Sequence, residues 1–181
     1  MLRFAEKFNF RETGNFALST NSKIIIYPGT FDPVTYGHID IINRAGELFD
    51  KIIVTVAINP SKNPLFSLEE RLNLLQESLS GMPNIEVTEF EGLVVDFAKS
   101  YNAKAILRGL RAVSDFEYEF QMALMNHKLN SNVRTLFMMP NEKYTYLNSS
   151  IIRNLAQFNA DVSEFVPSCV QSALLRKFPL K

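Results

Sequence analysis

The sequence predicts an α/β protein with a Rossmann-like parallel sheet of five strands, flanked by helices and followed by C-terminal helices. Two patterns lead to this prediction: short runs rich in β-branched residues recur along the chain, and segments with apolar residues at helical spacing lie between them. Strands that alternate with helices in this way form right-handed βαβ units, in which successive strands are parallel. The chain has 181 residues, of which 46% are hydrophobic, so it is long enough to bury a sizeable core.

The first half of the chain contains three predicted strands. The runs "KIIIY" at 23–27 and "KIIVTVAI" at 51–58 are continuous apolar segments of strand length, which is typical of strands buried on both faces. A helix is predicted between them from apolar residues at helical spacing, namely Ile41, Ile42, Ala45, Leu48 and Phe49. The next helix, "SLEERLNLLQESL", begins with Ser67 and Glu70 in capping-box spacing. "NIEVTEF" then predicts the third strand, and "LVVDFAKSY" a short helix.

The second half of the chain supplies the last two strands and three helices. "AKAILRG" predicts the fourth strand, and "VRTLFMM" the fifth. Between them, Ser114 and Glu117 have the spacing of a capping box for a long helix. Asn148–Ser149 can cap the following helix, and Pro167 suits the start of the last one.

Residues 1–22 are predicted to be an N-terminal extension, disordered or loosely docked, and residues 23–181 a single folded domain. Lys+Arg and Asp+Glu number 19 each, a balance that argues against bulk binding to nucleic acid or to a membrane surface. No apolar run approaches the length of a membrane span. The single cysteine excludes an intramolecular disulfide and fits a reducing compartment.

Polar and unusual segments follow four of the five predicted strands. They are residues 29–38, 59–62, 108–111 and 140–150. The carboxyl ends of parallel strands meet at one edge of a sheet, and ligands bind beyond that edge where the strand order reverses. We therefore expect the four segments to converge on one binding site.

The chemistry available at this edge favours phosphate binding. The sequence has neither G-x-x-x-x-G-K-[ST] nor G-x-G-x-x-G, and neither H-E-x-x-H nor a Cys/His cluster indicates a built-in metal site. The edge offers cations, hydroxyls and helix N-termini, from Thr30, His38, Lys62, Arg108, Arg111, Ser149 and Ser150. The absence of an obvious general base fits transfer between phosphates, because a phosphate oxygen is already an anionic nucleophile.

These motifs resemble those of a known enzyme family. "YPGTFDPVTYGH" is similar to the opening motif of the nucleotidylyltransferase superfamily, and "NSSIIR" to its second signature. "PSKNP", "LEERL" and "RGLRAVSDFEYE" resemble pantetheine-phosphate adenylyltransferases, over most of the chain from residue 23. The resemblance implies a Rossmann-like domain that uses Mg²⁺ to convert ATP and 4′-phosphopantetheine to dephospho-CoA and pyrophosphate. It also implies a cytoplasmic homohexamer inhibited by coenzyme A.

The resemblance also implies roles for individual residues. His38 would be catalytic, donating a hydrogen bond to the α-phosphate of ATP. The phosphopantetheine site would include Thr30, Lys62, Val94 and Arg108. The ATP site would include Thr30, Phe31, His38, Gly109, Leu110, Arg111, Glu119, Tyr144, Thr145, Tyr146, Leu147, Asn148, Ser149 and Ser150. Asp32, which precedes a proline, is interpreted as a turn residue with no catalytic role.

Some alternatives remain open at the level of sequence. Arg111 could instead pair with Asp115 or Glu119, and Glu119 could be a solvated carboxylate. The second signature has Asn148 where serine is commoner, although asparagine can also cap a helix. The rival activity is adenylyl transfer to nicotinate or nicotinamide mononucleotide, whose enzymes usually have histidine where Thr35 stands. A non-catalytic nucleotide sensor on the same fold is the alternative from another class.

Overall fold

A computed structural model of the protein describes residues 22–59, 63–111 and 113–179. Within these ranges, five parallel strands form one sheet in the order β3-β2-β1-β4-β5. The strands are β1 (Ile24–Gly29), β2 (Lys51–Ala57), β3 (Ile85–Phe90), β4 (Ala105–Gly109) and β5 (Arg134–Met138). The predicted Rossmann-like sheet is confirmed. The predicted extension over residues 1–22, apart from its last residue, lies outside the described residues.

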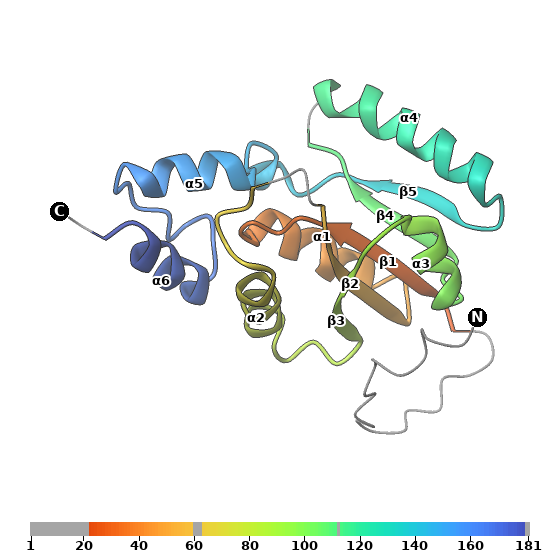
Figure 1. Ribbon diagram of the computed structural model, residues 1–181, viewed down its shortest axis with the longest axis horizontal. Coiled ribbons are helices and arrows are strands. Elements are labelled where there is room, and N and C mark those ends of the chain that lie inside the picture. The colour runs from red at the N-terminus through yellow and green to blue at the C-terminus, as the bar shows by residue number, and fades with distance from the viewer. Residues whose placement is uncertain (1–21, 60–62, 112, 180–181) are drawn as a thin grey trace.

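Helices cover both faces of this sheet (Figure 1). They are α1 (Tyr36–Gly46), α2 (Leu68–Ser78), α3 (Val94–Ser100), α4 (Val113–Leu129), α5 (Ser149–Gln157) and α6 (Ser168–Lys177), with a 3₁₀ turn, η1 (Glu142–Tyr144), before α5. Alternate residues of β1, β2 and β4 enter different cores, as the pleat of a strand requires. Ile25 faces the larger core, which is shared with α1, α2, α5 and α6, whereas Ile26 faces a smaller core against α3.

Local sequence signals place the helix starts well. Ser67 and Glu70 form the predicted capping box: the Glu70 amide donates to Ser67 Oγ at 3.1 Å, and the Ser67 amide donates to Glu70 Oε2 at 2.7 Å. Asn148 caps α5 as predicted, because its Oδ1 accepts from the Ile151 amide at 2.8 Å. The prediction for α4 is slightly wrong, since this helix begins at residue 113 and Ser114 already lies inside it.

The predicted extent of the first helix also needs correction. Leu48 and Phe49 were expected to continue it, but α1 ends at Gly46. The amides of both residues donate to the carbonyl of Ala45 at 3.0 Å, so the chain turns there instead of continuing the helix. Phe49 still packs on the larger core, while Leu48 is exposed. The apolar spacing therefore predicted the burial of Phe49 correctly and that of Leu48 wrongly, and it placed the end of the helix too late.

The strand order creates a crevice between β1 and β4. From β1 the chain proceeds outward through β2 to β3, then crosses to the other side of β1 to form β4 and β5 (Figure 1). Neighbouring connections therefore leave β1 and β4 in opposite directions, and their carboxyl ends border the position where parallel α/β sheets bind ligands. Within the described ranges, no helix is both long and apolar enough to cross a membrane.

Candidate active site

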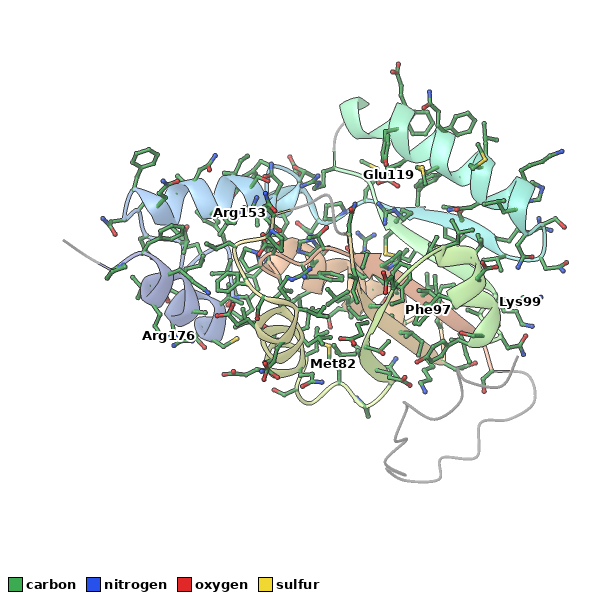
Figure 2. The ribbon with its side chains drawn as sticks, in the orientation of Figure 1. Met82, Phe97, Lys99, Glu119, Arg153 and Arg176 are labelled. Carbon is green, nitrogen blue, oxygen red and sulfur yellow. The ribbon has the colours of Figure 1, made fainter. Side chains whose placement is uncertain are left out.

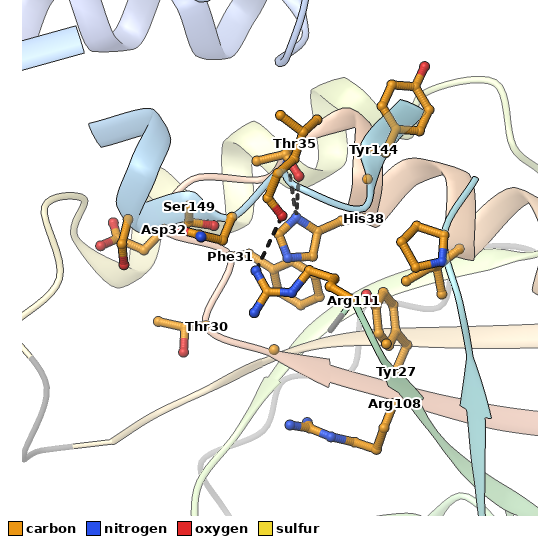
Figure 3. Close-up of a pocket in the computed structure, with 18 of the residues that line it drawn as sticks. Tyr27, Thr30, Phe31, Asp32, Thr35, His38, Arg108, Arg111, Tyr144 and Ser149 are labelled. Carbon is orange, nitrogen blue, oxygen red and sulfur yellow. Dashed lines mark hydrogen bonds between the residues drawn. The ribbon is translucent and has the colours of Figure 1, made fainter. Parts of the chain in front are cut away.

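A cavity of about 690 Å³ opens at the carboxyl ends of β1 and β4 (Figure 3). Its lining comes from the loop after β1, the loop after β4 and the start of α5. Most of the predicted site residues line it, namely Thr30, Phe31, His38, Arg108, Gly109, Arg111, Glu119, Tyr144, Leu147, Asn148, Ser149 and Ser150. Asn63 and Pro64 contribute from the segment after β2. Lys62, also predicted here, lies outside the described residues.

His38 lies in the first turn of α1, with one ring nitrogen held by the residue that precedes the helix. Its Nδ1 is 3.1 Å from the backbone nitrogen of Thr35 and 2.9 Å from Thr35 Oγ1. A backbone N–H can only donate, so Nδ1 is the acceptor and the neutral ring carries its proton on Nε2. This arrangement makes Nε2–H the donor that is left for a ligand.

The surroundings of His38 keep its ring neutral. Burial, followed by the positive charge of Arg111, lowers the pKa of His38 to about 4. Figure 3 shows the Arg111 side chain beside the imidazole. The N-terminus of a helix also disfavours a cation, which acts in the same direction. His38 is therefore an uncharged hydrogen-bond donor at neutral pH, and its Nε2–H can donate to an anionic ligand.

The imidazole rests on a tightly packed aromatic support. The Phe31 ring is buried and lies edge-on to His38, with 5.1 Å between ring centroids, and edge-on to Tyr27, with 5.6 Å. A Cβ at Gly29 would lie 2.8 Å from the Phe31 ring, so only glycine fits beneath it. Phe31 itself has a φ of 47°, which is rare for a residue other than glycine. This packing fixes the position of the catalytic candidate.

Asp32 holds the loop after β1 to its neighbours. Its carboxylate is buried and accepts hydrogen bonds from the amides of Leu65 and Phe66, both at 2.9 Å. It also pairs with Arg153 at 3.1 Å, and Arg153 donates to the Asp32 carbonyl oxygen as well. Each carboxylate oxygen thus has a partner within the protein, which agrees with a structural rather than a catalytic interpretation of Asp32.

Arg108 and Glu119 form a bidentate ion pair between β4 and α4. Arg108 Nε donates to Glu119 Oε2 at 2.7 Å, and Nη2 donates to Oε1 at 2.5 Å. Arg108 Nη1 donates to the Pro28 carbonyl at 3.1 Å. Burial lowers the pKa of Arg108, but hydrogen bonds and charge from Glu119 outweigh it, and the pKa is raised overall. The pair keeps Arg108 charged and its guanidinium oriented.

This pairing decides the alternative that the sequence left open for Glu119. The Glu119 side chain is only 12% exposed, so it is not a solvated carboxylate. Figure 2 shows it projecting from α4. Its bidentate partner is Arg108, and Arg111 Nη1 donates to the Leu147 carbonyl at 3.2 Å. The side chain of Asp115, the other predicted partner of Arg111, lies outside the described residues.

A second cavity of about 210 Å³ adjoins the first. The two share a wall made of Pro28, Gly29, Thr30, Arg108 and Glu119. The rest of the second cavity is mostly apolar and is lined by Ala57, Phe90, Val94, Ile106, Tyr118, Met122, Ala123, Asn126 and Thr135. Val94, predicted to contact a pantetheine arm, is therefore in the smaller cavity. The Arg108–Glu119 pair stands where the two cavities meet.

Three predicted ATP contacts lie beside the larger cavity without lining it. The Leu110 amide donates to the Met138 carbonyl at 3.0 Å. Thr145 Oγ1 donates to the Glu142 carbonyl at 2.8 Å, and the exposed Tyr146 ring packs edge-on against Phe165. In this structure none of these three residues lines the cavity.

The sequence interpretation also missed residues that belong to the site. Arg153 and Thr35 line the larger cavity, and the former occupies the last position of the "NSSIIR" motif. Thr35 immediately precedes the helix, a position at which a threonine is a common cap. Both signals were present in the sequence. In contrast, Tyr27 lies at the end of an apolar strand and reads as a core residue until the cavity is seen.

A family model described as cytidylyltransferase-like matches residues 26–155, which include most of the sheet and the whole of the larger cavity's loops. Solved structures also resemble the fold. One of them, a protein from Vibrio parahaemolyticus assigned as a nicotinate-nucleotide adenylyltransferase, superposes with a TM-score of 0.66 over 86% of this chain and 93% of its own. The two sequences are 19% identical, so this likeness concerns the fold alone.

Curated relatives are much more similar in sequence. A phosphopantetheine adenylyltransferase from Caldanaerobacter subterraneus subsp. tengcongensis is 58% identical over 86% of this chain and 98% of its own length. The enzyme of that name from Desulfosudis oleivorans is 57% identical over 86% and 92% of the two chains. That from Alkaliphilus metalliredigens is 55% identical over 86% and 99%.

Proposed function

The chain belongs to the phosphopantetheine adenylyltransferase family, and we propose that the two adjoining cavities are where it joins its substrates. The enzyme transfers the adenylyl group of ATP to 4′-phosphopantetheine and so makes dephospho-CoA and pyrophosphate in coenzyme A biosynthesis. One observation supports this location most strongly. Arg108 borders both cavities, while the neutral donor His38 lies in the larger one.

The larger cavity would hold ATP. The predicted contacts Thr30, Phe31 and Arg111 line it, and so does the start of α5 at Ser149 and Ser150. Free amides at a helix N-terminus attract phosphate oxygens. Asn148 caps the amide of Ile151, which leaves the amides of the preceding residues for a ligand. The triphosphate would therefore lie between the loop after β1 and the start of α5.

The smaller cavity would hold the pantetheine arm, whose mainly apolar lining includes Val94. The phosphate of phosphopantetheine would then lie at the shared wall, near Thr30 and Arg108, with Lys62 as the further predicted contact. Three of the five N–H groups of Arg108 are used by Glu119 and Pro28. Phosphate recognition would use the two that remain on its terminal nitrogens.

The reaction needs a well-placed donor more than it needs a base. A phosphate monoester has its second pKa near 6, so at neutral pH its oxygen is already an anionic nucleophile. This oxygen would attack the α-phosphorus of ATP, and the bond from that phosphorus to the oxygen bridging to the β-phosphate would break, releasing pyrophosphate. His38 Nε2–H and Arg111 would stabilise the charge on the five-coordinate phosphorus.

Mg²⁺ would accompany ATP. Within the described residues, no group of three or more His, Cys, Asp or Glu side chains could hold a metal ion, and the carboxylates of Asp32 and Glu119 are occupied by arginines. Mg²⁺ usually takes most of its ligands from water and substrate phosphates. The neutral oxygens of Thr30 and Ser150 fit a supporting role, and the ion would supply charge neutralisation of the phosphates.

We further propose a cytoplasmic homohexamer that coenzyme A inhibits. Helix α4 packs against β5 and α3 at the edge of the sheet (Figure 1) and exposes a row of large apolar side chains, including Phe116, Phe120, Leu124 and Met125. Covering such a face in contacts between subunits would remove it from water. Coenzyme A contains both the pantetheine arm and the adenylyl group, so it would compete for both cavities. Light scattering of the purified protein tests the assembly.

The activity is tested by measuring pyrophosphate release with two acceptors. The proposal predicts release with 4′-phosphopantetheine and formation of dephospho-CoA, verified by mass spectrometry, and background release with nicotinate mononucleotide. Activity confined to the mononucleotide would overturn the proposed substrate. Tight ATP binding with no pyrophosphate release in the presence of either acceptor would instead support the nucleotide sensor.

A further inference from the structure

A buried arginine outside both cavities reaches the backbone of the loop that lines them. Arg71 lies on α2 and is only 6% exposed. Its Nη1 donates to the Thr30 carbonyl oxygen at 3.0 Å, and its Nε donates to the Ser67 carbonyl at 3.4 Å. A buried charged side chain requires hydrogen-bond partners. Arg71 donates to two backbone carbonyls, and that of Thr30 belongs to the candidate site.

The geometry of the peptide bond links the Arg71–Thr30 contact to the direction of the Phe31 amide. The peptide bond between Thr30 and Phe31 is trans, because the cis peptide of this region is Asp32–Pro33. In a trans peptide the C=O and the following N–H lie in one plane and point in opposite directions. Because Arg71 holds the Thr30 carbonyl on the side of α2, the Phe31 N–H points away from α2, on the side where Thr30 and Phe31 line the larger cavity.

The Phe31 amide is suited to a ligand. Among the residues that the structure describes, no protein group accepts its proton, although Phe31 as a whole is only 2% exposed. Buried amides are almost always hydrogen-bonded, so a donor left over at the wall of a cavity implies water or a ligand as its partner.

The conformation at Phe31 needs external support. Its φ of 47° lies in the left-handed region, which costs free energy for any residue with a side chain. The Phe31 ring is held by Tyr27 and His38, and the carbonyl before it is held by Arg71. These contacts act on the two sides of the same strained residue. Loss of the Arg71 contact would free the peptide plane to rotate while the ring stays in place.

We propose that Arg71 is a positioning residue, which aims the Phe31 amide at a phosphate oxygen of ATP during adenylyl transfer. This inference rests on the proposed use of the larger cavity for ATP. An arginine suits the role because its planar fork spans the carbonyls of Ser67 and Thr30, whereas a lysine offers a single flexible ammonium. Arg71 therefore ties the start of α2 to the phosphate-binding loop without touching the substrate.

Kinetics of three variants test the proposal. Arg71→Met removes the donors, Arg71→Lys keeps the charge, and Leu74→Ala is the matched control, since it weakens the buried face of the same helix one turn later. At a temperature where all three are folded, Arg71→Met should lower kcat/KM for ATP by about 10- to 100-fold, because a transition-state donor is misplaced. Arg71→Lys should recover part of this loss. Leu74→Ala should change kcat/KM less than about threefold, at a comparable loss of melting temperature.

The Phe31 amide itself supplies a readout that needs no turnover. In wild-type protein labelled with ¹⁵N, addition of pyrophosphate should shift the Phe31 amide resonance; in Arg71→Lys and Arg71→Met this shift should be reduced or lost. Should Arg71→Met not fold, Arg71→Lys carries both measurements. The positioning role would be overturned if the Arg71 variants kept the full pyrophosphate-induced shift of the Phe31 amide. It would also be overturned if Arg71→Met lowered kcat/KM no more than Leu74→Ala does. A wild-type enzyme that fails to transfer the adenylyl group would instead overturn the proposed function, and the pyrophosphate titration would still decide the role of Arg71.

Discussion

The neutrality of His38 predicts a specific dependence of protein stability on pH. In the folded protein burial and Arg111 lower the pKa of His38 to about 4, whereas the unfolded chain has the ordinary value near 6.5. Between these values the unfolded state binds more protons than the folded state, so stability falls as pH decreases. The stabilising contribution is present above pH 6.5 and is lost progressively as the pH falls to about 4.

The size of the effect follows from the same two pKa values. Between pH 7 and pH 5 the linkage relation gives a loss of about 2 kcal/mol for this one group. Because the His38 ring is half-buried and lines an open cavity, solvent reduces this figure, and about 1 kcal/mol is the expected loss. For a domain of this size, that corresponds to a fall of about 2–4 °C in melting temperature.

The measurement compares wild type with His38→Asn, in which the amide oxygen can still accept from the Thr35 backbone N–H but the side chain does not titrate. Urea unfolding at several pH values between 7 and 4.5 gives the free energy of unfolding of each protein. Other groups titrate equally in both, so their contribution cancels in the difference. We expect wild type to lose about 1 kcal/mol relative to the variant between pH 7 and pH 5. Parallel curves would refute the assignment of His38 as a neutral donor with a lowered pKa.

Three substitutions test other parts of the site. His38→Ala should lower turnover by about 10²- to 10³-fold, as loss of a transition-state donor does, with far smaller changes in substrate affinity; unchanged steady-state turnover would remove His38 from the mechanism. Arg108→Lys cannot reproduce the bidentate pair with Glu119, so KM for phosphopantetheine should rise about 10-fold, and an unchanged KM would separate Arg108 from that substrate. Gly29→Ala would place a Cβ 2.8 Å from the Phe31 ring and should cost about 1–3 kcal/mol of stability by urea unfolding, a cost that wild-type stability would contradict.

The sequence predicted the sheet and the place of the site because both depend on local patterns. Apolar runs of strand length indicated β1, β2 and β4, which lie inside the sheet with both faces buried, and runs with β-branched and aromatic residues indicated the edge strands β3 and β5. The polar segments after β1, β4 and β5 converge because parallel strands bring their carboxyl ends to one edge. The family resemblance then supplied most of the residues that line the larger cavity.

Contacts between distant segments were beyond sequence reasoning. Arg71 and Thr30 are 41 positions apart, and although Arg71 lies in the "LEERL" motif, the motif does not indicate which groups its side chain contacts. The left-handed conformation of Phe31 is likewise unmarked, because no glycine or asparagine occupies the position. Both features follow from how the loop after β1 packs against α1 and α2, which only the folded structure reveals.

The stereochemical course at the α-phosphorus tests most directly whether two adjoining cavities bring both substrates together for a single attack. ATP with a chiral α-phosphorothioate would be converted by the enzyme, and the configuration of the dephospho-CoA analogue determined by ³¹P NMR. Direct attack by the phosphopantetheine phosphate predicts inversion. Retention would mean that the adenylyl group passes first to the protein, and would contradict the account given for His38, Arg108 and the shared wall.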